Sequence, residues 1–238
     1  MRDHQNLRAE ENEKIEKLRA GYSMLTPILQ SYSSSSQTAQ PKRIRAIEFL
    51  WKKILLIRKM GYIPNGFYTV VIYANIPEKG SNSIFDDERV KSLLDPLSVD
   101  DVKDLMIHRT DVEKYRPFLG EYLWALYSSY DFLIARVILL LIEGRDKRDA
   151  ITGKINKSNL IYWYQDENTR SVIDVILNDE EKKTIYTTKD NSFKLATDLL
   201  EKKIIEHSTK VLSGEIEAYN NSDKESEILK KLIQVRNW

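Results

Sequence analysis

The sequence predicts a mostly α-helical protein, a helical bundle around one long buried central helix at residues 118–143, with at most a minor β-hairpin or two short strands. Only 8 of the 238 residues are glycine and 6 are proline, so few positions interrupt a helix. The stretch 118–143 contains no proline, and several other stretches repeat apolar residues at spacings of three and four.

Residues 118–143 form the central helix of this prediction because one broad face is apolar at about 100° per residue. That face carries Leu119, Tyr122, Leu123, Leu126, Tyr130, Leu133, Ile134, Val137, Leu140 and Leu141. Residues 137–142 are apolar on every side, which is typical of a helix buried all round. Gly144 and the charged run after it predict the end of the helix near residue 143.

Asp131 and Arg136 interrupt this apolar stretch. Each would cost several kcal/mol at the depth of a bilayer, so the helix is expected in a soluble core and not across a membrane. The two residues lie five positions apart and project from different sides of the helix, so they cannot simply neutralise each other. We expect both to be at least partly buried and to find structural partners elsewhere in the fold, with a pocket or a subunit contact as the alternative.

Residues 1–30 are predicted to form an amphipathic helix or arm, with apolar residues at heptad-like spacing from Ile15 to Tyr32. A serine-rich linker follows at 31–41, and residues 42–238 form the helical core domain. The N-terminal helix either packs on its own core or joins copies of the chain through residues 8–30.

The stretch 42–60 is a second strong helix with the sharpest local charge signal, seven basic residues against the single acid Glu48. If its apolar face packs on the central helix, its basic face points outward. Such a face suits nucleic-acid phosphates, and an aromatic side chain among the cations could stack on a base. The predicted contacts are Lys42, Arg45, Phe49, Lys52, Lys53 and Lys59.

Residues 66–76 are ambiguous because β-branched and aromatic residues favour a strand. The only other strand candidate is 184–188, far away along the chain, so a helix capped by Asn65 is slightly favoured. Further on, a helix can start at Asp86, and Ser98 with Asp101 resembles a capping box. Helices are also predicted over 167–179, 191–212 and 223–238.

Residues 145–158 form a basic loop followed by an aromatic run at 160–164. These rings could stack nucleic-acid bases, but a place in the core is the commoner role.

The sequence contains no phosphate-binding glycine loop, no metalloprotease motif and no cysteine, and it predicts no cofactor. The three histidines are far apart, at positions 4, 108 and 207. Asp174, Glu181 and Lys183 resemble a weak nuclease pattern. A divalent metal held by scattered acids is the other enzymatic possibility. Those acids are Asp86, Asp87, Asp100 and Asp101.

The leading functional prediction is a non-enzymatic, cytoplasmic helical subunit that docks to a protein partner, in an assembly that can include nucleic acid. The net charge of +1 offers no general argument for nucleic acid or membranes, so this prediction depends on the local charge of 42–60. The charged first residues do not resemble a signal peptide. The alternatives are a metal-dependent, nuclease-like enzyme and a homo-oligomeric helical scaffold, and no motif identifies a family.

Overall fold

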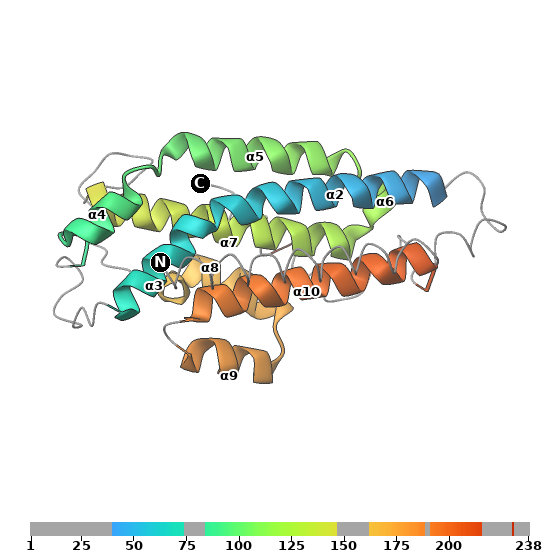
Figure 1. Ribbon diagram of the computed structural model, residues 1–238. Helices are drawn as coiled ribbons and strands as arrows, with labels where there is room; N and C mark the ends of the chain where they lie inside the picture. The colour runs from blue at the N-terminus through green and yellow to red at the C-terminus, as the bar shows by residue number, and fades with distance from the viewer. Residues whose placement is uncertain (1–39, 74–83, 147–161, 189–190, 216–229, 231–238) are drawn as a thin grey trace, which may run out of the picture.

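The computed structural model describes residues 40–73, 84–146, 162–188, 191–215 and 230, and within these ranges all regular structure is helical and no strand occurs. The predicted mostly α-helical bundle is therefore confirmed (Figure 1). Three predictions concern segments that lie almost entirely outside the described residues. These segments are residues 1–39, the loop after residue 146 and the helix at 223–238.

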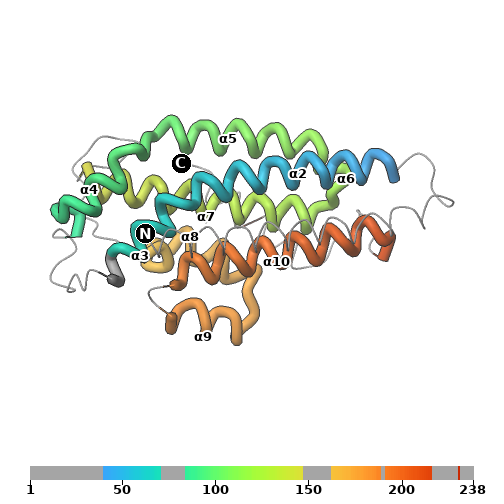
Figure 2. Tube along the Cα trace, in the orientation of Figure 1, coloured from blue at the N-terminus to red at the C-terminus, as the bar shows by residue number. Residues whose placement is uncertain are grey.

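Helix α7 (Glu121–Asp146) is the centre of the bundle, and the tube in Figure 2 shows it running between α5 (Val99–Glu113) and α10 (Ser192–Ser213). It also packs against α2 (Gln40–Met60) and α8 (Glu167–Ile176). By length and composition α7 could cross a membrane, but 89% of its most apolar 18-residue segment is buried inside the protein. That burial is compatible with a soluble protein.

Both ends of the central helix differ from the predicted 118–143. Gly120 has a φ of 82° and ends the short helix α6 (Arg116–Leu119), so α7 starts only at Glu121. At the other end α7 continues through Gly144 to Asp146. A Cβ atom at Gly144 would lie 2.1 Å from the Phe85 ring. Gly144 therefore permits a close approach between α7 and Phe85 and does not end the helix.

Replacing Gly144 with alanine is expected to lower the free energy of unfolding by about 1–3 kcal/mol, because the Phe85 ring must move out of a packed core. Urea denaturation measures the loss. Gly66→Ala is the matched control, since Gly66 lies inside α3 (Tyr62–Tyr73) and its Cβ would make an ordinary 3.4 Å contact with the Leu93 side chain. That variant should gain roughly 0.5–1 kcal/mol from helix propensity. Equal effects at both glycines would contradict the Phe85 contact.

Helix α2 begins at Gln40, two residues inside the predicted linker, and buries one apolar face. That face consists of Ala46, Ile47, Leu50, Trp51, Ile54 and Ile57. After Gly61 the chain continues as α3, so the helix favoured for residues 66–76 is confirmed as far as residue 73.

The predicted cap at Asn65 is wrong, because α3 starts at Tyr62 and Asn65 lies within it. Pro64 is tolerated because it occupies the first turn, where a missing N–H breaks no helical hydrogen bond.

The alternative strand at 184–188 is also helical, since all but its last residue belong to α9 (Asp179–Thr187). Asn178 caps α9 in a capping box with Glu181. The predicted helix 167–179 is confirmed as α8 up to Ile176, and only its last residue, Asp179, belongs to α9. Local hydrogen bonding at Asn178 thus outweighs the strand propensity of the residues that follow.

The predicted capping box of Ser98 and Asp101 is confirmed at the start of α5. The helix expected from Asp86 starts two residues later as α4 (Glu88–Leu94), with Asp87 as its N-cap. A short 3-10 turn, η2 (Trp163–Gln165), precedes α8.

Candidate nucleic-acid interface and buried charges

Four of the predicted phosphate contacts on α2 are exposed: Lys42, Arg45, Lys52 and Lys59. Arg45, Lys52 and Lys59 are spaced seven residues apart. Seven residues of helix rise by about 10.5 Å, so these three cations follow one line of about 21 Å. This line forms the outer side of α2, opposite the buried apolar face.

Lys53 and Phe49, the other two predicted contacts, are engaged inside the protein. The ammonium of Lys53 lies 2.9 Å from His108 Nδ1 and 2.9 Å from Asp111 Oδ2, and its side chain is 12% exposed. The Phe49 ring lies 4.7 Å from the Tyr115 ring, with Lys53 Nζ 5.3 Å from its centroid. Both residues therefore join α2 to the chain around α5.

The Lys53 contact explains the electrostatics of its neighbours. Burial first, and then the ammonium of Lys53, lower the pKa of His108 below its ordinary value. Hydrogen bonds from Lys53 and Lys114 lower the pKa of Asp111. A neutral His108 can accept a hydrogen bond from Lys53, whereas a protonated ring would repel it.

The acids proposed as a metal site serve as local helix partners. Asp87 caps α4 and binds Arg89, which lowers the pKa of Asp87 to about 2. Asp100 pairs with Lys103 at 2.6 Å, and Asp101 accepts a 2.7 Å hydrogen bond from the Ser98 amide. Asp86 is exposed. Within the described ranges no group of three potential ligands is arranged to hold a metal ion.

The nuclease-like set is not assembled either. Asp174 on α8 accepts a hydrogen bond from the Tyr186 hydroxyl, whereas Glu181 pairs with Lys203 at 2.9 Å. Lys183 is exposed on α9. The three residues belong to two helices, and the two carboxylates bind different neighbours, so the pattern is not assembled as one metal site.

Asp131 is fully buried on α7 and pairs with Arg109 of α5, whose side chain is 10% exposed. The sequence reasoning missed Arg109. A signal was present, because Arg109 falls on the apolar face of α5, in step with buried Leu105 and Val112. A cation within an apolar helix face indicates a buried partner of opposite charge.

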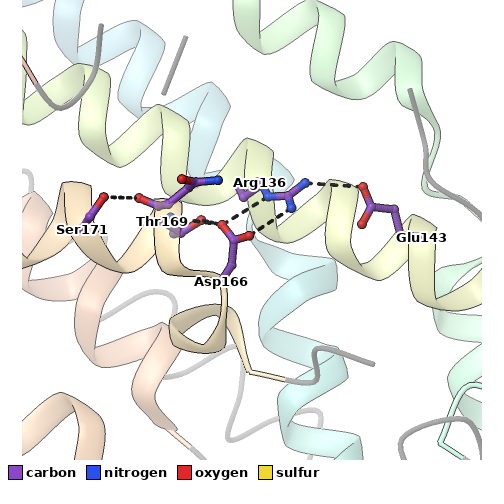
Figure 3. Close-up of polar contacts among 6 residues, drawn as sticks. Arg136, Glu143, Asp166, Thr169 and Ser171 are labelled. Carbon is purple, nitrogen blue, oxygen red and sulfur yellow. Dashed lines mark hydrogen bonds and ion pairs between the residues drawn. The ribbon is translucent and has the colours of Figure 1, made fainter. Parts of the chain in front are cut away.

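Arg136 on α7 bridges two buried carboxylates, as Figure 3 shows. Its guanidinium donates to Asp166 at 3.0 and 3.3 Å and to Glu143 at 3.4 Å. Asp166 also caps α8 through the amide of Thr169 at 3.0 Å. Burial acts to raise the pKa of Asp166, but the hydrogen bonds from Arg136 and Thr169 outweigh it and hold that pKa below its usual value.

A third, partly buried contact joins α2, α7 and α10. Arg58 Nε donates to Glu201 at 3.0 Å, and the Tyr130 hydroxyl donates to the same carboxylate at 2.6 Å. Arg58 is therefore a structural cation, unlike the exposed cations on the outer side of the same helix.

The aromatic run beside the basic loop packs within the protein. The Tyr162 ring stacks on the Tyr164 ring at 5.3 Å and lies nearly parallel to the Tyr68 ring at 6.5 Å, and Trp163 is fully buried. The rings of this run therefore pack against one another and against Tyr68. This matches the core role that the sequence favoured.

No known protein family, curated protein or solved structure matches this chain. Its function is therefore argued from the contacts of its own residues.

Proposed function

We propose that this protein is a non-enzymatic, cytoplasmic helical subunit that docks to a protein partner and contacts nucleic-acid phosphates with the outer side of α2. One observation carries the proposal. Within the described part of the chain, no carboxylate pairs with the exposed cations of that helix face. Those cations are Lys42, Arg45, Lys52 and Lys59.

Lysine and arginine side chains that neutralise phosphates release condensed counterions, which gives affinity that depends on salt and not on sequence. A straight line of cations suits an extended backbone of phosphates. Phe49, the ring expected to stack on bases, packs on Tyr115. The proposed contact is therefore with the phosphate backbone and is independent of base identity.

The contacts of the acidic residues support a non-enzymatic role. Asp87, Asp101 and Glu181 are engaged as helix caps. Asp100 binds a neighbouring lysine. Carboxylates used in this way are poorly placed to hold a catalytic metal ion.

Charge reversal of Lys42 and Arg45 is expected to weaken binding of a fluorescein-labelled nucleic-acid duplex about tenfold or more. It should also flatten the salt dependence, since each lost phosphate contact removes about 0.9 from the slope of log affinity against log salt. Fluorescence anisotropy over a range of NaCl concentrations measures both quantities. Lys53 is left intact because it binds His108 and Asp111.

The matched control is Lys183→Glu with Lys194→Glu, which makes the same charge change at exposed positions on α9 and α10. The control variant should keep the wild-type slope. Equal affinity and slope in the wild type and the Lys42 and Arg45 variant would refute the phosphate contact. Purification of the tagged chain from its host, with and without nuclease, then tests for a stoichiometric protein partner.

A further inference from the structure

Exposed aliphatic side chains concentrate on three neighbouring helices. Within the described ranges, six large hydrophobic residues are exposed. Four of them, Ile107 on α5, Leu55 and Leu56 on α2 and Ile205 on α10, are 37–58% exposed. Figure 1 shows α2 antiparallel to both α5 and α10, and α2 packs against each.

The contacts between α2 and α5 place two of these residues at the same level. Lys53 binds both His108 and Asp111, so these positions face each other across the seam between the two helices. In an antiparallel pair, one turn forward on α2 corresponds to one turn backward on α5. Leu56 therefore lies level with Ile107, and both are exposed on the solvent side of the seam.

The same argument applies to the seam between α2 and α10. Arg58 binds Glu201 across it. Leu55 lies one turn before Arg58, and Ile205 lies one turn after Glu201, so these two exposed residues also share a level. Together Ile107, Leu56, Leu55 and Ile205 form what we call the apolar band, which crosses α2 instead of following it.

Two cations border the apolar band on α2. Lys52 lies one turn before the leucines and Lys59 one turn after them, about 10.5 Å apart along the axis. An α-helix with its side chains is about 10–12 Å wide. On the neighbouring helices, Lys103 pairs with Asp100 and Lys202 with Glu206. The other exposed acids of the three helices are Glu48 on α2, Asp104 on α5 and Asp198 on α10. Glu48 lies about two turns before the leucines, so the exposed charged residues within one turn of them on α2 are both positive.

We propose that the apolar band is the docking surface for an acidic amphipathic helix of the protein partner. The apolar stripe of that helix would cover the four aliphatic residues, and carboxylates on its two flanks would reach Lys52 and Lys59. This inference rests on the proposed function and specifies its protein partner. The docked helix would occupy Lys52 and Lys59, so Lys42 and Arg45 are the exposed α2 cations that would remain for phosphates. Arg45 lies ten residues before Leu55, about 15 Å along α2, and stays clear of the docked helix.

The test uses a fluorescein-labelled peptide of about three heptads, with leucine on a narrow stripe and glutamate on both flanks. The matched peptide has lysine in place of glutamate. The full chain is expected to bind the glutamate peptide about tenfold more tightly or better, as measured by anisotropy. The double variant Leu56→Ser and Ile107→Ser, which we call the band variant, should weaken that binding about tenfold. Lys52→Glu with Lys59→Glu should reverse the preference between the peptides.

Met106→Ser is the matched control, because Met106 is 56% exposed on the side of α5 away from α2. It should leave peptide binding unchanged. The proposal is overturned if the glutamate peptide binds no better than the lysine peptide, or if Met106→Ser weakens binding as much as the band variant. It is also overturned if anionic lipid vesicles bind the wild type but not the band variant while neither peptide binds, since the band would then be a membrane surface.

The band variant keeps every cation of α2, so its affinity for the nucleic-acid duplex should equal that of the wild type. Loss of peptide binding with intact duplex binding supports the docking surface. Peptide binding without any duplex binding by the wild type would remove the phosphate contact from the proposed function and leave the docking surface standing.

Discussion

Asp131→Asn is expected to lower the free energy of unfolding by about 3–5 kcal/mol, because it keeps the side-chain shape but leaves the Arg109 guanidinium buried without its counter-charge. Asp131 is fully buried and Arg109 nearly so. Solvent therefore cannot replace the lost partner at low cost. Urea denaturation at neutral pH, with the m-value compared between the two proteins, measures the change.

The control for this prediction removes both charges. Arg109→Met with Asp131→Leu replaces the ion pair by apolar groups of similar size, and such replacements are often neutral or stabilising. The double variant should therefore be more stable than Asp131→Asn. A cost below about 1 kcal/mol for the single variant would mean that the pair is as weak as an exposed one.

Arg136→Met should destabilise the protein by a similar amount, about 3–5 kcal/mol at neutral pH. Arg136 pairs with Asp166 and also contacts Glu143, and both carboxylates are buried. Without the guanidinium, the effect of burial on the Asp166 carboxyl is no longer offset by the hydrogen bonds from Arg136. The pKa of Asp166 therefore rises, and the folded variant is penalised while this carboxyl stays ionised.

The pH dependence of this variant has a definite sign. In the wild type, the lowered pKa of Asp166 contributes stability that is present above the unfolded pKa and lost as the pH falls through the folded value. In the variant, the Asp166 carboxyl has a raised pKa and takes up a proton as the pH falls. Protonation removes the cost of burying its charge. The stability gap between the two proteins should thus be widest near pH 7 and narrow toward about pH 4.

Arg170→Met on α8 is the matched control for Arg136→Met. Arg170 pairs with Asp174 at 3.9 Å and is 52% exposed, so its loss should cost less than about 1 kcal/mol. Equal losses at Arg136 and Arg170 would show that the buried network adds nothing to stability.

Local patterns predicted most of the helices correctly. The capping box at Ser98 follows from two residues three apart, and the apolar face of α2 follows from its periodicity. One error arose where a tertiary contact outweighed the local sequence signal. Gly144 is normally a helix-ending residue, yet the Phe85 ring makes it a packing requirement inside α7.

The candidate site could likewise be predicted only in part. Composition and helical spacing predicted that residues 42–60 carry a basic face. The sequence could not show which of these cations remain exposed, because Lys53 and Arg58 bind carboxylates on α5 and α10, more than fifty residues away along the chain. The apolar band could not be predicted from the sequence either. Its four residues come from three helices, and only Leu55 and Leu56 are close together along the chain.

By itself, the sequence determined that the chain is helical, that one helix is buried and that α2 carries excess positive charge. Periodicity and capping act over a few residues and can be read locally. The tertiary structure alone decided the partners of Asp131 and Arg136 and the separation of structural cations from exposed ones. Those outcomes depend on which helices become neighbours. A charged residue on an apolar helix face, such as Arg109, indicates a buried ion pair, but no single stretch of sequence identifies its partner.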